Sequence, residues 1–337
     1  MKTDKIKVHF TDNDLIAPTN PIEVNLIGAG GTGSKVLTAL VEMNYSLNEL
    51  GHAGIAVRLW DDDIVTDSNL GRQRFAECEV GLYKSVALIN RSNRWAGTNW
   101  KAETTKFERD SLDRLPEHAQ ASIYISCVDS VKARFEIAEI LKGLNSYRAY
   151  RNQAKYWMDF GNSQSTGQVL LSTIGSIKQP KSEKYQAVAS LPFITDEYGE
   201  LLKRSEETDN TPSCSLAEAL EKQDLYINSS LAQMGCSLLW NLFRNGMTEN
   251  KGFFHNLANF TTQPIKVAYS PSQAAHRHSF PRRRNTAARR SGAATYAKPS
   301  SLPFSPFIRF RITDCGIINH LYYWRWSFLF EAAIMYL

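Results

Sequence analysis

The segment that most constrains the fold is the glycine-rich run IGAGGTGSK at residues 27–35. It follows the apolar run IEVNL, which predicts a buried strand, and it leads into residues 32–45, whose apolar positions recur at helical spacing. Gly28, Gly30 and Gly33 have the spacing G-x-G-x-x-G, which lets a strand turn sharply into a helix while backbone N–H groups face an anion. The run therefore predicts an α/β sheet with a phosphate group at the start of a helix. NAD, FAD and ATP all fit this description.

The pattern of strand, loop and helix recurs along the first half of the chain. Residues 54–63 predict a second strand that ends in acids, and residues 121–130 predict another, followed by a helix over 131–144. Repetition of this kind is typical of a Rossmann-like, doubly wound and mostly parallel sheet. Residues 155–162 and 167–174 are strand-like runs joined by the turn-forming NSQSTG, which predicts a smaller antiparallel extension.

Composition divides the chain into three parts. Residues 1–20 indicate an irregular lead-in, residues 21–268 a folded region, and residues 269–337 a basic, disordered tail rich in Ser, Arg, Ala and Pro. The folded region comprises a nucleotide-binding half, 21–150, and a second half, 151–268. In the second half we expect a long polar loop over 176–213, a helix over 214–246 and a final strand or strand pair over 253–267.

The net charge of +5 is unevenly distributed. Residues 271–337 hold ten lysines and arginines against two acids, a net charge of +8, so the remainder carries −3. The basic character belongs to the tail, and the body lacks the basic balance expected of a specific nucleic-acid-binding protein. The tail ends in an apolar stretch at 317–337, but Arg325 and Glu331 inside it would be costly in a bilayer. We therefore do not expect a membrane span.

The cysteines indicate a reducing compartment. The five cysteines are scattered with no C-x-x-C pair, which argues against a disulfide framework and against a four-cysteine structural zinc site. The first residues, MKTDKIKVHFTDNDL, are polar and lack the apolar core of a secretory signal. We therefore expect a cytoplasmic protein.

Charged residues follow the predicted strands at the edge where a nucleotide would bind. Asp61 ends the second strand, Asp129 follows the strand at 121–130, and Arg72 and Lys84 lie in segments that return to the same edge. Mg²⁺ is usually held by one or two carboxylates together with phosphate oxygens. Two acids and two cations beside a phosphate loop therefore suit ATP with Mg²⁺ better than NAD, which gives no role to Lys84 and Asp129.

Four motifs together carry a family resemblance, namely GAGGTGS, DDDIVTDSNLGRQ, Lys84 and CVDSVKAR. In this combination the chain resembles the ThiF/MoeB/HesA proteins, the bacterial relatives of ubiquitin-activating enzymes, over residues 21–267. The polar insertions and the segment PSCSLAEALEKQ look most similar to the ThiF-family protein of the PRTRC plasmid-borne gene cluster. The resemblance implies that residues 21–268 form a ThiF-type adenylation domain.

The resemblance also implies which residues bind ATP. The glycine loop, Gly31 included, would face the phosphates. Asp61 would hold the ribose, and Asp63 is expected to contact the nucleotide beside it. The N-L-x-R-Q motif would contact the phosphates through Asn69, Arg72 and Gln73.

The implied reaction is adenylation of the C-terminal carboxylate of a small ubiquitin-like or sulfur-carrier protein. The carboxylate attacks the α-phosphate of ATP, pyrophosphate leaves and an acyl-AMP remains. Arg72, Lys84 and a Mg²⁺ ion held by Asp129 would stabilise the charge on the phosphates, and Arg134 would lie below Asp129. The resemblance further implies a homodimer.

Cys214 has two interpretations. It matches the position of a thiol that ThiF uses, and a helix N-terminus would lower the pKa of such a thiol. The same segment also predicts a plain helix start, with Ser213 or Ser215 as the cap and Glu218 completing a capping box with Ser215.

The sequence departs from the family pattern in three places. Its first arginine is Arg58, so no arginine precedes it in the region from which family members lend one to a partner subunit. It also lacks the paired C-x-x-C motifs of family zinc sites, and its tail has no counterpart. The first departure leaves open an ATP-binding scaffold without turnover. An NAD-dependent oxidoreductase remains a third alternative that depends on the glycine motif alone.

Overall fold

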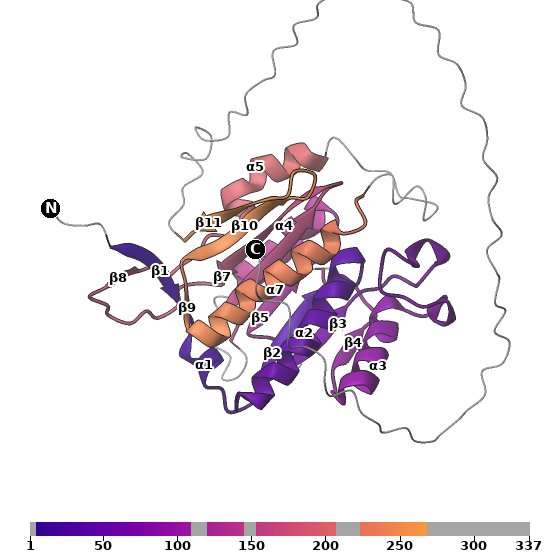
Figure 1. Cartoon of the computed structure of the whole chain (residues 1–337), viewed down its shortest axis with the longest axis horizontal. Helices are drawn as coiled ribbons and strands as arrows, with labels where there is room; N and C mark the ends of the chain where they lie inside the picture. Colours follow the sequence, from indigo (N-terminus) through magenta and orange to yellow (C-terminus); the bar gives the residue numbers. More distant parts are fainter. Residues whose placement is uncertain (1–4, 109–119, 145–152, 207–222, 268–337) are drawn as a thin grey trace, which may run out of the picture. The chain divides into compact units, whose positions relative to one another are not determined.

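The computed structural model describes residues 5–108, 120–144, 153–206 and 223–267 (Figure 1). For the tail at 269–337 we expected disorder and no membrane span. These residues lie outside the described ranges. Among the helices within the ranges, none combines the length and the apolar character that a membrane crossing requires.

The described strands of the nucleotide-binding half form a parallel sheet, as predicted. β2 (Ile22–Ile27) pairs with β3 (Ile55–Trp60) and with β5 (Ile123–Ser126), and β4 and β6 extend the sheet in parallel on the two sides. Beyond β6 the strands are antiparallel, which confirms the smaller extension. The sheet order is β11-β10-β7-β6-β5-β2-β3-β4, with β4 (Lys101–Glu103), β6 (Tyr156–Asn162), β7 (Thr166–Thr173), β10 (Asn250–Asn256) and β11 (Thr261–Lys266).

Helices cover both faces of this sheet, so the fold is doubly wound. Neighbouring residues of a strand point to opposite faces. Ile123 therefore lies in one buried cluster with α2 and α7, whereas Tyr124 lies in a second cluster with α4 and α5. Figure 1 shows α2 and α7 side by side across the sheet. The main helices are α2 (Gly31–Glu49), α3 (Lys84–Ala96), α4 (Val131–Leu144), α5 (Ile194–Glu206) and α7 (Ile227–Asn245).

The expectation of an irregular lead-in at 1–20 is wrong. Residues Ile6–Phe10 form β1, the middle strand of a separate small sheet with the order β8-β1-β9. A short helix, α1, follows at Asn13–Ile16. The strand escaped prediction because it is short and pairs only with residues far away in the chain. Its partners are β8 (Tyr185–Ala187) and β9 (Met247–Thr248).

The expected loop over 176–213 is also partly wrong, since it contains β8 and α5. The polar composition of this segment conceals a helix whose apolar positions Ile194, Tyr198 and Leu202 are buried against the sheet. Of the expected helix over 214–246, residues 214–222 lie outside the described residues. In the described part a turn stands at 225–226, and α7 starts at Ile227. It ends at Gly246, which adopts the left-handed conformation with φ 64°.

Candidate functional site

A cavity of about 490 Å³ lies at the carboxyl ends of the parallel strands. The loops that follow β2, β3 and β5 line this cavity. The segment at 72–73 and the residues at the start of α7, Gln223 and Asn228, complete the lining. This is the edge at which ligands of open α/β sheets bind. The predicted site residues that line the cavity are Gly28, Gly30, Gly31, Asp61, Asp63, Arg72, Gln73, Lys84 and Asp129.

The glycine loop needs glycine for two different reasons. Gly28 has a φ of 94°, and a Cβ atom there would lie 2.8 Å from the carbonyl oxygen of Cys127. A Cβ atom on Gly33 would lie 1.9 Å from the carbonyl oxygen of Gly28, so this glycine allows the helix to start directly against the strand. Gly30 has open space around it and faces the cavity. The loop therefore brings bare backbone to the cavity, where phosphates could approach it.

Asp61 fixes the glycine loop as well as lining the cavity. Its Oδ2 atom accepts a hydrogen bond of 2.6 Å from the backbone N–H of Ala29, and its Oδ1 atom accepts one of 3.0 Å from Asp63. Burial raises the pKa of the Asp61 carboxyl, and the bond from Ala29 and the charge of Lys84 act against that rise. Asp61 therefore joins the end of β3 to the loop after β2.

Lys84 enters the cavity from the first residue of α3. Its side chain is 9% exposed, and Nζ lies 2.7 Å from Oδ2 of Asp63, whose side chain is 65% exposed. The adjacent Ser85 hydroxyl donates to the carbonyl oxygen of Asp61 at 3.0 Å, which holds the start of α3 against the end of β3. The ammonium group is thus fixed in place while its acidic partner remains in contact with water.

Arg72 and Gln73 present polar atoms that are buried without a partner. Within the described part, Nε of Arg72 and Oε1 of Gln73 have no hydrogen-bond partner. Arg72 donates from Nη1 to Oε1 of Gln223 at 3.3 Å, and burial lowers the pKa of its guanidinium group, an effect that the charge of Asp129 opposes. Buried polar atoms are normally hydrogen-bonded, so the two orphaned atoms indicate a place for a polar ligand.

Two predicted residues do not reach the cavity. Asn69 is buried, and its Oδ1 atom accepts hydrogen bonds from the backbone and hydroxyl groups of Thr66 at 2.9 and 3.1 Å. Its carboxamide therefore closes the short helical turn at Asp67–Asn69. Gly33 lies behind the loop, against Gly28. Both residues shape the segments that line the cavity.

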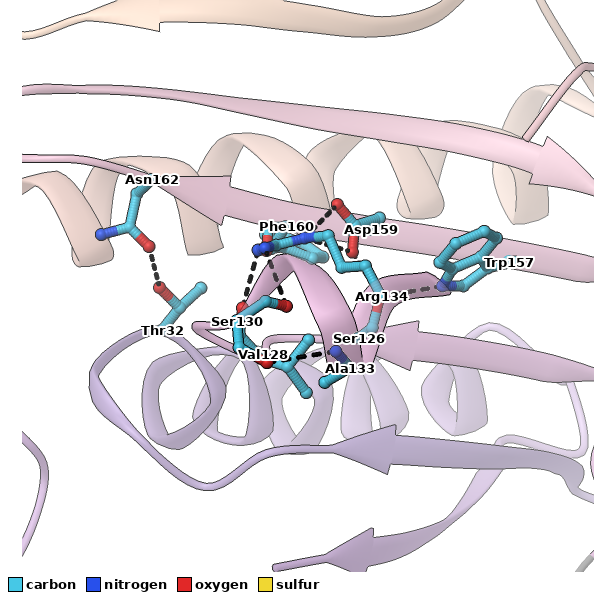
Figure 2. A network of polar contacts seen from close by, with 10 residues as sticks. All are labelled: Thr32, Ser126, Val128, Ser130, Ala133, Arg134, Trp157, Asp159, Phe160 and Asn162. Carbon is cyan, nitrogen blue, oxygen red and sulfur yellow. Dashed lines mark hydrogen bonds and ion pairs between the residues drawn. The ribbon is translucent and has the colours of Figure 1, made fainter. Parts of the chain in front are cut away.

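The loop that carries Asp129 is held in place by a buried ion pair between Arg134 and Asp159. Figure 2 shows Arg134 bonded to Asp159 and to Val128, the residue before Asp129. Arg134 lies one turn into α4, and its Nε atom is 3.1 Å from both carboxylate oxygens of Asp159 on β6. Its Nη2 atom donates to the carbonyl oxygens of Val128 at 2.6 Å and Phe160 at 3.0 Å. Since Val128 precedes Asp129, the guanidinium group fixes the position of the loop from which the exposed Asp129 carboxylate faces the cavity.

The donor set of the cavity fits a magnesium ion that arrives with phosphate. In the described ranges no three His, Cys, Asp or Glu side chains gather closely enough to hold a metal by themselves. Mg²⁺ usually takes only one or two carboxylates and completes its shell with water and phosphate oxygens. The exposed carboxylate of Asp129 satisfies that requirement.

Residues 6–278 match the ThiF family. The chain belongs to the ThiF family. Solved structures that are similar to it include PaaA, with 16% identity and a TM-score of 0.46, covering 73% of this chain and 64% of PaaA. Escherichia coli MccB in complex with ATP has 16% identity and a TM-score of 0.45, covering 77% of this chain and 66% of MccB. The chain thus spans just under two thirds of the length of these proteins. None of the curated proteins matches it significantly.

The second half of this ThiF-family chain supplies cavity residues that sequence reasoning missed. Asn228 at the start of α7 accepts from the hydroxyl of Thr32 at 2.7 Å and donates to Gln223 at 2.8 Å. Gln223 in turn accepts from Arg72, so these residues connect the glycine loop to the segment at 72–73. Asn162, at the end of β6, also lines the cavity. No local motif marks these residues, because their partners in the first half of the chain, Thr32 and Arg72, lie more than a hundred positions away.

The cysteines differ in their relation to the site. Cys214 lies outside the described residues, so its two interpretations stand as they were. Cys127 is half-buried, with one side packed against the core and the other lining the cavity. Burial raises the pKa of the Cys127 thiol well above its usual value, which keeps the thiol protonated.

Proposed function

We propose that this chain activates a carboxylate by ATP-dependent adenylation. The observation that carries the proposal is that one cavity gathers the bare glycine loop, the strand-end acids Asp61 and Asp129, and the cations Arg72 and Lys84. Membership of the ThiF family supports the same assignment. A dinucleotide would leave the Lys84 ammonium group and the Asp129 carboxylate without a function.

The chemistry needs positioning more than a protein nucleophile. A carboxylate oxygen of the substrate forms a bond to the α-phosphorus atom, the bond from that atom to the bridging oxygen breaks, and its electron pair leaves with pyrophosphate. Arg72 and Lys84 would stabilise the charge on the phosphate oxygens. Lys84 can turn from Asp63 to phosphate at low cost, because the exposed Asp63 carboxylate regains water. Asp61 would hold the ribose while keeping the glycine loop in place.

Magnesium completes the proposed site. Asp129 would hold the ion, which when bound would neutralise phosphate charge during the departure of pyrophosphate. The part played by the chain itself is to keep Asp129 at the cavity through the buried pair of Arg134 and Asp159.

The proposed substrate is the C-terminus of a small ubiquitin-like or sulfur-carrier protein, and the proposed setting is a cytoplasmic homodimer of the PRTRC type. In this proposal the peptide tail of the substrate enters the cavity and places its carboxylate at the α-phosphate, beside Arg72 and Lys84. Transfer of the acyl group to Cys214 would be a later step. It exchanges the oxygen of AMP for the sulfur of a thiolate and releases AMP.

ATP–pyrophosphate exchange tests this function. The full-length chain is mixed with ATP, Mg²⁺, labelled pyrophosphate and candidate carrier proteins that end in Gly-Gly, including those encoded near its gene. We expect exchange that depends on the carrier, is lost in Asp129→Asn and persists in Asp67→Asn. Asp67 is an exposed acid outside the cavity lining, so it is the matched control. ATP binding without exchange for every carrier would contradict the proposal.

An ATP-binding scaffold without turnover is the second candidate. The absence of an arginine before Arg58, in the middle of β3, favours this candidate. Family members lend an arginine from that region to the partner subunit, and here the only strong cations in that region are lysines. A scaffold would bind ATP tightly, form no AMP and respond little to Asp129→Asn. If NADH rather than ATP binds, as followed by quenching of its fluorescence, the dinucleotide alternative replaces both candidates.

A further inference from the structure

Lys35 is a buried lysine behind the phosphate loop, and the proposed reaction does not use it. It lies in the first turn of α2, and only 9% of the residue is exposed. Its Nζ atom donates to the carbonyl oxygen of Arg72 at 2.8 Å and to that of Gly31 at 3.3 Å. The two acceptors belong to the two segments that line the cavity. One ammonium group therefore ties these segments together from behind.

The neighbouring contacts strengthen this connection. The backbone N–H of Arg74 lies 3.4 Å from the hydroxyl oxygen of Ser34, the residue before Lys35. Arg72 and Gln73 lie where the chain is held by these bonds to Lys35 and Ser34, and their Nε and Oε1 atoms are the buried atoms without a partner among the described residues. The first turn of α2 thus determines where both side chains enter the cavity. Lys35 is absent from the cavity lining, so its influence on a ligand would be exerted through Arg72 and the loop.

The charges around Lys35 are unfavourable unless an anion is present. Burial lowers the pKa of Lys35 to about 8, and the guanidinium charges of Arg74 and Arg72 add to this shift. Burying a cation between two other cations costs stability, and an apolar side chain would avoid that cost. The arrangement is therefore explained if the cavity beyond it receives strongly negative phosphates.

We propose that Lys35 is a positioning residue for polyphosphate, which clamps the Arg72 backbone to the glycine loop and couples ATP binding to proton uptake. The inference rests on the proposed ATP site but not on the identity of the carrier. Phosphates bound beside Arg72 offset the repulsion from the two guanidinium groups and favour the charged form of Lys35. Its pKa therefore rises when ATP binds.

The sign of the pH dependence follows from this rise. In the free protein Lys35 loses its proton as the pH passes about 8. In the complex it keeps the proton to a higher pH, so binding takes up a proton between the two values. ATP affinity is then constant below that range and falls as the pH rises through it. Between pH 7 and pH 9 the loss is at most about tenfold, because one proton is linked to binding and the free protein loses it only as the pH passes about 8.

Titration calorimetry with ATP and Mg²⁺ tests the proposal. It is carried out at pH 7 and pH 9 on wild type, Lys35→Met and the control Lys101→Met, which removes an exposed lysine from β4. We expect wild type and the control to lose affinity at pH 9. Lys35→Met should bind about tenfold more weakly at pH 7 and show no further loss at pH 9, because both the clamp and the titrating group are gone. At pH 8, buffers of different ionisation enthalpy should reveal proton uptake in wild type and in the control, but not in Lys35→Met.

A purely structural role for Lys35 would give a different result. Lys35→Met would then melt at a lower temperature but keep the wild-type pH dependence and proton uptake, which would overturn the inference and leave the proposed function intact. If Lys35→Met fails to fold, Lys35→Gln provides the same test, because it keeps a donor without the charge. Wild type that binds no ATP would remove the inference and the proposed function together. ATP binding without pyrophosphate exchange would remove the proposed function alone.

Discussion

At the scale of single residues, Gly33 is expected to matter for the stability of the fold and Gly30 for the binding of ATP. A methyl group on Gly33 would lie 1.9 Å from backbone oxygen, whereas one on Gly30 meets nothing within 4 Å. We expect Gly33→Ala to lower the free energy of unfolding by about 1–3 kcal/mol or more, because the loop must shift. Gly30→Ala should keep its melting temperature and lose ATP affinity, since its methyl group stands where phosphate would approach. Equal ATP affinity in Gly30→Ala and wild type would show that no phosphate lies against Gly30.

Arg72 gives a second test at this scale. Its Nε atom is buried and has no hydrogen-bond partner among the described residues, and a guanidinium group can offer two parallel donors to phosphate. We expect Arg72→Lys to keep the charge but lose the paired geometry, which should weaken ATP binding by about ten- to a hundredfold. The nearby Arg74→Lys is the matched control, because Arg74 is exposed and outside the cavity lining. An equal effect of the two changes would mean that only net positive charge matters.

Residues with local motifs could be predicted, and residues defined by distant partners could not. Asp61, Lys84 and Asp129 follow strands or begin helices, so the rule of the carboxyl edge places them together. Asn69 belongs to the same motif as Arg72, but its carboxamide is used by its own turn. Gln223 reaches the site only because α7 packs along α2, which no local pattern reveals.

At the scale of elements, the ion pair of Arg134 and Asp159 joins α4 to β6 below the site (Figure 2). Both side chains are at least 95% buried. We expect Arg134→Met to destabilise the fold by about 3–5 kcal/mol, because it leaves the Asp159 carboxylate buried without its partner. The double change Arg134→Met with Asp159→Leu should recover much of that loss in chemical denaturation. If it recovers none, the bonds from Arg134 to the Val128 and Phe160 carbonyl oxygens are what stabilise this region.

The small sheet provides a prediction of pH dependence. His9 on β1 is buried, with Nδ1 2.7 Å from the Val188 oxygen and Nε2 3.0 Å from the Tyr156 hydroxyl. Burial lowers the pKa of His9 below 6.5, although the bond to Val188 and the charge of Asp12 oppose this. Below pH 6.5 the unfolded chain therefore binds more protons than the folded one, so the free energy of unfolding decreases as the pH is lowered. The slope of unfolding free energy between pH 7 and pH 5 should be smaller in His9→Gln, and equal slopes would exclude this role.

Elements could be predicted where hydrophobic periodicity is local. Strands β2, β3 and β5 and helices α2 and α4 are apolar enough to be recognised alone. β1, β4 and β8 are each five residues or shorter and become strands only through distant partners. Helix α5 was missed because its mean composition is polar and its backbone departs from helical geometry at Tyr198, where φ is −126°.

At the scale of the whole molecule, the choice between ATP and NAD becomes a question of which ligand stabilises the fold. The cavity connects the ends of β2, β3 and β5 with α3 and with the start of α7, so a ligand there would link elements from both halves of the chain. A ligand that binds only the folded state at a hundred times its Kd stabilises that state by about 2.7 kcal/mol. We expect ATP with Mg²⁺ to raise the melting temperature accordingly, and NAD at the same concentration to leave it unchanged. In Asp129→Asn the shift produced by ATP alone should persist, while the additional shift produced by Mg²⁺ should disappear. A shift with NAD that survives Lys84→Met would instead assign the glycine loop to a dinucleotide, because only the triphosphate requires the Lys84 ammonium group.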